Sequence, residues 1–286
     1  MKSGNADGAK DRQEGRDGME AAKEKQPAAV PARATQAGEI RARWAWVEPS
    51  VWTDRMLEAL ETGVKGGKWY SLMDKVYRRE NLRAAFREVA ANRGAPGVDH
   101  VTIEQFKHQE EAQLERLERT LQDGTYRPQA IRRTYIPKPG SQERRPLGIP
   151  TVRDRTVEAA LRHVMEPIFE RQFAERSYGF RPGRGCKDAL REVNRLLRAG
   201  YRHVVEADWR SYFDTIPWAK LMARVEERIA DGRVLALVKA FLSQGVMEDG
   251  QLREAKEGTP QGGVITPLTQ KVTWGRCPLW PIASRN

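Results

Sequence analysis

The chain has 286 residues and carries 50 Lys and Arg against 39 Asp and Glu, a formal net charge of +11 at pH 7. This excess favours a polyanionic partner, with nucleic acid as the leading candidate and a merely basic protein as the alternative. Two cysteines, Cys186 and Cys277, are too few for a disulfide framework or a zinc site. Because no apolar run approaches the ~20 residues of a membrane span, we expect a cytoplasmic protein with no membrane partner.

The first part of the chain separates into an arm and a helical region. Residues 1–45 contain almost no large apolar side chains, so they cannot offset the entropy of ordering, and we expect a disordered arm. Residues 46–125 predict helices. One is expected over residues 74–92 and another over 103–121, the second beginning at a Thr-x-x-Gln capping box at residues 102–105.

A basic hairpin is predicted next. Residues 131–136 alternate between apolar and polar, a Pro-Lys-Pro-Gly turn follows, and residues 143–150 form the returning strand. Five basic side chains crowd this unit: Arg132, Arg133, Lys138, Arg144 and Arg145. Like charges so close together repel one another unless an anion is present. We therefore expect the hairpin to bind phosphate or nucleic acid, with plain solubility as the alternative.

A helix, a glycine-rich loop and a second helix are expected after the hairpin. Residues 151–173 are helical in pattern, and Pro167 predicts a kink or an early stop. The loop at 177–185 either makes a tight turn or stacks bases and holds phosphates. Its candidate nucleic-acid contacts are Tyr178, Phe180, Arg181 and Arg184. The helix over 187–198 is expected to bury Leu190, Val193, Leu196 and Leu197.

A carboxylate follows the next apolar run. Residues 204–205 predict a short strand that presents Asp208 at its end, where a carboxylate can hold Mg²⁺ against phosphate. The alternative is an acid that caps the helix beginning near Pro217. Further helices, a hairpin about residues 248–250 and a flexible glycine-rich loop at 258–263 complete the pattern.

Four sequence blocks occur in a fixed order. They are Tyr-Ile-Pro-Lys-Pro-Gly at 135–140 with the run 145–155, Ser-Tyr-Gly-Phe-Arg-Pro-Gly-Arg at 177–184, Ala-Asp to Phe-Asp at 207–214, and Thr-Pro-Gln-Gly-Gly-Val-Ile at 259–265. Together they resemble the reverse transcriptase/maturase proteins encoded by group II introns, over residues 69–268. The resemblance implies polymerase fingers and the start of a palm over residues 126–268. Such a right hand is an α+β fold, helix-rich with short antiparallel hairpins.

The resemblance also implies roles for single residues. Asp208 matches the family's first metal-binding aspartate, which coordinates Mg²⁺ for polymerisation. Phe213 matches the residue beneath the sugar that selects deoxynucleotides, with an ordinary core aromatic as the alternative. Asp214 matches a position that is not a metal ligand and is expected to be structural.

Other positions match the family's nucleotide and template contacts. Gln261 matches the glutamine beside the incoming nucleotide, and Gly262 lets the backbone approach it. The side chains that resemble the triphosphate-binding residues of the fingers are Lys138, Arg144 and Arg145. Residues 178–181 resemble the template-side loop. The implied partners are group II intron RNA, an RNA template with a DNA primer, and deoxynucleoside triphosphates.

The end of the chain departs from the family pattern. The family continues into a hairpin that carries Ala-Asp-Asp, whereas residues 269–286 form a divergent tail without that motif. A frameshift or premature stop gives such a tail, so we expect a truncated chain that is inactive as a polymerase by itself. The alternatives are a non-catalytic fragment that binds intron RNA and a fragment that folds poorly.

Overall fold

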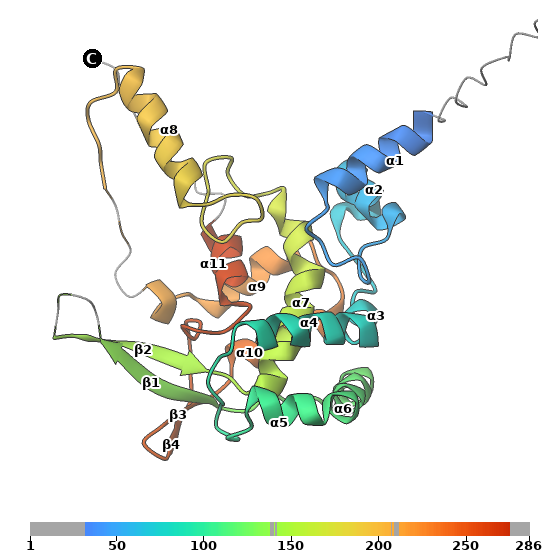
Figure 1. The fold of residues 1–286 in the computed structure, drawn as a ribbon, viewed down its shortest axis with the longest axis vertical. Helices are drawn as coiled ribbons and strands as arrows, with labels where there is room; N and C mark the ends of the chain where they lie inside the picture. Colours follow the sequence, from blue (N-terminus) through green and yellow to red (C-terminus); the bar gives the residue numbers. More distant parts are fainter. Residues whose placement is uncertain (1–31, 138–139, 141, 207, 209–211, 275–286) are drawn as a thin grey trace, which may run out of the picture.

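The computed structural model describes residues 32–137, 140, 142–206, 208 and 212–274 (Figure 1). The expected disordered arm therefore lies mostly outside the described residues, but its end is ordered. Residues Ala32–Arg43 form helix α1, so that part of the expectation was wrong. Ile40 packs against the core and the Arg41 Nε donates to Asp54 Oδ1 over 2.9 Å, which gives this short helix the tertiary contacts that its polar composition lacks.

The helical region that follows is more divided than its pattern predicts. Its elements are α2 (Asp54–Thr62), the 3₁₀ turn η1 (Lys65–Gly67), α3 (Met73–Val76), α4 (Arg79–Ala91), α5 (Ile103–His108) and α6 (Glu110–Gln122). Each expected helix is split in two. The buried Asn81 side chain stabilises the first break, because its Nδ2 donates to the carbonyls of Lys75 and Val76 at the end of α3. The capping box of Thr102 is confirmed at the start of α5.

A mixed sheet of four strands carries the predicted hairpins. The strands are β1 (Ile131–Pro137), β2 (Arg144–Ile149), β3 (Val246–Glu248) and β4 (Gln251–Arg253), in the order β2-β1-β3-β4. Antiparallel pairing of β1 with β2 and of β3 with β4 confirms both hairpins, and the β1–β3 pairing is parallel. Asp249 and Gly250 turn the second hairpin with φ of 50° and 77°, as a type I′ turn requires.

Helix α7 (Val152–Glu170) forms the centre of the core and packs against α3, α4, α6 and α11 (Figure 1). The helix runs on past Pro167 without the expected early stop. A proline removes the N–H that would bond to the carbonyl four residues earlier, here that of His163. The Trp52 indole Nε1 donates to this carbonyl over 2.8 Å, so the helix continues without an unsatisfied buried acceptor.

The remaining helices follow α7 in the chain. They are α8 (Cys186–Arg198), the 3₁₀ turn η2 (Tyr212–Asp214), α9 (Trp218–Glu226), α10 (Gly232–Leu242) and α11 (Thr266–Trp274). One carboxylate links the start of α10 to α3. Asp231 accepts hydrogen bonds from the Leu72 and Met73 amides through Oδ2, and from the Arg233 and Val234 amides through Oδ1. No helix in the described ranges is long and apolar enough to cross a bilayer.

Two expectations about packing were wrong. Helix α8 forms, but it extends away from the rest of the fold (Figure 1), and Leu190 is 67% exposed. Residues 204–205 form no strand, and both valines are about four-fifths exposed, at 80% and 78%. A local apolar pattern shows which surface can be buried but supplies no partner. Within the described part of the chain, no strand pairs with residues 201–206.

Candidate active site

Three segments that are far apart in the sequence meet beside the β1–β2 hairpin. The Gly148 amide of β2 donates to the Gln261 carbonyl over 2.6 Å. The Thr259 amide donates to the Phe213 carbonyl over 2.7 Å, and the Gly258 amide donates to the Ile216 carbonyl over 2.9 Å. Backbone hydrogen bonds therefore connect the hairpin, the glycine-rich loop and the segment after Asp208. We call this the hairpin–loop junction.

The close approach at the junction requires glycine. Gly262 has a φ of +113°, and a Cβ there would lie 2.2 Å from the Gly148 carbonyl oxygen. Gly258 has a φ of +82°, and its Cβ would lie 2.7 Å from the Phe213 carbonyl oxygen. Both positions combine a backbone conformation that side chains disfavour with a backbone atom in the way. The glycines predicted to give flexibility instead allow tight packing.

A buried acid from α7 holds the far end of the same loop. Glu158 is 1% exposed, and its Oε2 accepts a hydrogen bond from the Val264 amide and lies 3.4 Å from the Ile265 amide nitrogen. Burial raises the pKa of Glu158 to about 7, and the nearby Asp154 carboxylate adds to the rise. No sequence pattern indicates this role, because the loop that Glu158 holds lies more than a hundred residues away.

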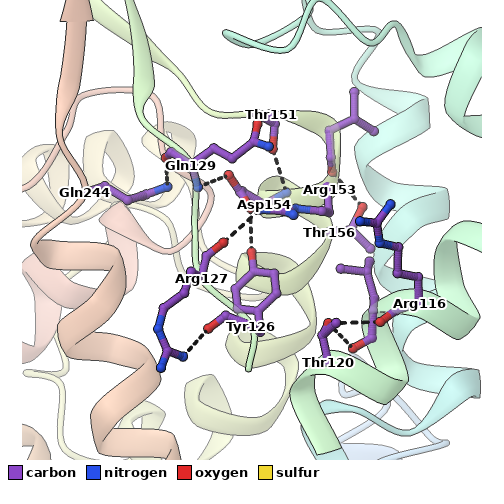
Figure 2. A network of polar contacts seen from close by, with 12 residues as sticks. Arg116, Thr120, Tyr126, Arg127, Gln129, Thr151, Arg153, Asp154, Thr156 and Gln244 are labelled. Atoms are coloured by element: carbon purple, nitrogen blue, oxygen red, sulfur yellow. Dashed lines mark hydrogen bonds and ion pairs between the residues drawn. The ribbon is translucent and has the colours of Figure 1, made fainter. Parts of the chain in front are cut away.

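A second buried acid fixes the base of the hairpin to α7 (Figure 2). Asp154 accepts from the Tyr126 hydroxyl over 2.6 Å and from the Gln129 amide over 2.9 Å. The Gln244 side chain completes the network by donating to the Gln129 carbonyl over 2.7 Å. Burial and the Asp154 carboxylate raise the pKa of Tyr126 well above its usual value, so the phenol stays a donor. This network positions the entry to β1.

The basic residues of the hairpin divide into different surroundings. Arg144 and Arg145 are exposed on β2, whose register places Arg145 opposite Ile136. Arg132 is half-buried, and its Nε and Nη2 donate to the Pro96 carbonyl over 3.0 and 2.7 Å. Arg133 is also half-buried, and Lys138 lies outside the described residues. Of the four that the structure describes, Arg132 is therefore engaged within the protein, whereas Arg144 and Arg145 remain exposed.

The expected template-side loop contains one exposed ring and one buried arginine. Phe180 is 75% exposed and has a φ of 51°, while Tyr178 is half-buried. Arg181 is only 8% exposed, and its guanidinium pairs with Glu170 at 2.8 Å. Arg181 therefore does not lie on an accessible nucleic-acid-binding surface, contrary to the expectation. Arg184 is half-buried and donates to the Glu175 carbonyl. Both arginines therefore support the shape of the loop.

Asp208 is exposed, five positions before the half-buried Phe213, and Asp214 is exposed as well. A single accessible carboxylate suits Mg²⁺, which proteins hold through one or two carboxylates together with substrate phosphates. Among the residues that the structure describes, no group of three His, Cys, Asp or Glu side chains gathers into a metal cluster. Asp208 therefore remains a candidate for one ligand of a metal site.

The sequence matches known proteins over this same region. Residues 136–275 match the family described as "Reverse transcriptase (RNA-dependent DNA polymerase)". The chain is 38% identical to Protein YkfC of Escherichia coli K12 over 81% of this chain and 58% of that protein. It is 37% identical to group II intron-encoded protein LtrA of Lactococcus lactis subsp. cremoris, covering 66% of this chain and 31% of LtrA.

A third relative is nuclear intron maturase 2, mitochondrial, of Arabidopsis thaliana. The identity is 32% over 36% of this chain and 15% of that protein. The chain therefore spans less than two thirds of the length of each of these three curated relatives.

Proposed function

Because the chain belongs to the reverse transcriptases related to group II intron-encoded proteins, we propose that it forms part of an RNA-directed DNA polymerase that also assists splicing and mobility of its intron. The hairpin–loop junction is the observation that carries this proposal. It links the backbone of Phe213, of Gln261 and of the hairpin that bears Arg144 and Arg145. These are the segments on which a polymerase would hold an incoming nucleotide.

Each group in this site has a chemical task in the proposal. Asp208 holds Mg²⁺, which neutralises charge on the substrate phosphates when it is bound. Arg144 and Arg145 contact the triphosphate, for which the guanidinium fork is well shaped. Phe213 lies beneath the sugar and opposes a 2′-hydroxyl. Gln261 lies beside the base of the incoming nucleotide, on a loop whose Val264 amide donates to Glu158.

Nucleotide binding tests the proposal without requiring catalysis. The assay measures the affinities of a deoxynucleotide and the matching ribonucleotide for the chain on an RNA template–DNA primer with Mg²⁺. The Phe213→Val variant is expected to reduce the ratio of deoxynucleotide to ribonucleotide affinity by about tenfold, because the smaller side chain opposes the 2′-hydroxyl less. A tenfold change corresponds to roughly 1.4 kcal/mol. Tyr70→Val, which changes an exposed ring with no assigned role, is the matched control. An unchanged preference in Phe213→Val contradicts the assigned role.

A second candidate is a non-catalytic RNA-binding role for this 286-residue polypeptide. The net charge of +11 and the exposed positions of Arg144, Arg145 and Phe180 favour it. Affinity for intron RNA should then fall steeply with salt, because bound phosphates release counterions. Nucleotide binding separates the two candidates. Mg²⁺-dependent deoxynucleotide binding that is lost in Asp208→Asn supports the polymerase, and RNA binding without nucleotide binding supports the second role. Primer extension by this chain alone would contradict the expectation that it is inactive by itself.

A further inference from the structure

A pocket of about 230 Å³ lies away from the hairpin–loop junction, between α6 and the segment that leads into β1. Three arginines line it, Arg116 from α6, Arg127 from that segment and Arg153 from the start of α7. Thr120 and Thr125 add polar surface, and no carboxylate lines the pocket. A concave site with this composition is suited to an anion.

Two of the arginines are held in place by the protein itself. The Arg153 guanidinium lies 5.2 Å from the centre of the Tyr126 ring, and its Nη2 donates to the Arg127 carbonyl over 2.8 Å. Arg153 also pairs with the buried Asp154 at 3.2 Å. Arg127 Nη1 donates to the Gly124 and Tyr126 carbonyls over 2.9 and 2.8 Å. These contacts fix the two side chains in advance of any ligand, which lowers the entropy cost of binding.

The third arginine has no neutralising partner. The acids next to Arg116 on α6 are engaged elsewhere, because Glu115 pairs with Arg119 at 2.7 Å and Glu118 pairs with Arg79 at 2.6 Å. Over the ranges that the structure describes, Arg116 has no ion pair. Asp154 offsets Arg153 alone, so positive charge remains at the mouth of the pocket. Such charges repel one another until an anion binds.

We propose that this pocket binds a backbone phosphate of a nucleic-acid strand. Arginine presents a fork of donors that matches phosphate oxygens, and fixed arginines favour phosphate over a diffuse counterion. The Asp154 network connects the pocket to the base of the hairpin (Figure 2), so a phosphate bound there would lie near the entry to β1. The inference rests on the proposed function only in taking nucleic acid as the source of the phosphate.

A pair of double variants with equal loss of charge tests the pocket. Arg116→Ala/Arg127→Ala removes two pocket cations, and Arg119→Ala/Arg195→Ala removes two exposed cations that pair with Glu115 and Glu192. Binding of a short single-stranded RNA is measured over a range of KCl concentrations. The pocket variant should lose about tenfold in affinity at low salt, and its salt slope should fall by about 0.7. The control variant should keep its slope.

Further measurements protect the test against trivial explanations. Arg116→Ala alone serves as a second variant, because no hydrogen bond of its guanidinium is seen in the described structure, and thermal unfolding checks that each variant is folded. Titrations with inorganic phosphate and with polyglutamate identify the source of the anion. The expected result is that RNA binds with pocket-dependent affinity and that polyglutamate competes poorly.

Several outcomes overturn the proposal. Equal losses in the two double variants show general charge attraction. Pocket-dependent binding of inorganic phosphate with unchanged RNA affinity shows a small-anion site, and strong competition by polyglutamate shows an acidic polymer. If the wild-type chain does not bind RNA at all, the proposed function fails, and the phosphate titration still decides whether the pocket is an anion site.

Discussion

Substitution of Gly262 by alanine should break the hairpin–loop junction. The new Cβ would lie 2.2 Å from the Gly148 carbonyl oxygen and 3.1 Å from Leu147 Cδ1, so the loop must move away from β2. That movement separates the Gly148 amide from the Gln261 carbonyl, which it contacts over 2.6 Å. The matched control is Gly250→Ala in the β3–β4 turn. Gly250 also has a positive φ, +77°, but its Cβ would meet nothing within 4 Å.

Both variants lose stability through backbone strain, and only Gly262→Ala also loses packing and a hydrogen bond. A left-handed conformation costs alanine about 1–2 kcal/mol at either position. Gly262→Ala adds about 1–3 kcal/mol for overpacking and about 1 kcal/mol for the lost hydrogen bond. We therefore expect Gly262→Ala to reduce the free energy of unfolding by about 3–6 kcal/mol, against about 1–2 kcal/mol for Gly250→Ala.

Denaturant unfolding of both variants measures the difference, and nucleotide affinity measures its effect on the site. Gly262→Ala should weaken nucleotide binding even at temperatures where the protein stays folded, whereas Gly250→Ala should not. Equal destabilisation by the two substitutions would refute the reasoning, because it would show that the close approach to Gly148 contributes nothing.

Four other substitutions test separate parts of the fold. Asp231→Ala should reduce the free energy of unfolding by about 2 kcal/mol, because four backbone amides lose their acceptor. Although burial opposes ionisation, these amides lower the pKa of Asp231. The difference in stability between Asp231→Ala and the wild type should therefore shrink as the pH of the unfolding measurement falls below about 4. Glu158 has a pKa raised to about 7, so wild-type stability should fall as pH rises from about 4.5 to 7, by about 3 kcal/mol. Glu158→Gln keeps an acceptor without the charge, and its unfolding curve should lack this fall; an equal fall in both proteins would contradict the assignment. In thermal unfolding, Leu161→Ala should reduce the free energy of unfolding by about 3 kcal/mol, because Leu161 is buried. Leu190→Ala should reduce it by under about 0.5 kcal/mol, because Leu190 is exposed. Similar reductions in the two variants would show that α8 is packed against the fold.

The elements that the sequence predicted well are those whose signals are local. The β1–β2 hairpin has an alternating pattern and a Pro-Lys-Pro-Gly turn, and the Thr102 capping box needs only four residues; both are confirmed. The continuation of α7 through Pro167 was not predictable in this way. It depends on Trp52, whose indole reaches the His163 carbonyl from a distant part of the chain.

The sequence indicated which residues belong to the candidate site, but not which contacts hold them in place. The family motifs indicated Asp208, Phe213 and Gln261, whose roles remain predictions, and the structure links the backbones of the last two through one loop. Glu158 was missed because an acid on a helix has no pattern that distinguishes a buried loop anchor from a solvated side chain. Arg181 was misplaced for the converse reason, since its partner Glu170 becomes a neighbour only in the folded chain.

The parallel pairing of β1 with β3 constrains the order in which the protein folds. Ile131 pairs with Val246, so forming the middle of the sheet closes a loop of roughly 115 residues, at an entropy cost of about 4 kcal/mol. Helix α7 and the hairpin beside it need only local contacts and can form first. On the ribosome, the β1 edge of the hairpin therefore stays unpaired until residues 246–248 of β3 have been synthesised, and the glycine-rich loop can close against the hairpin only after that. The hairpin–loop junction is therefore completed late in the assembly of the described fold.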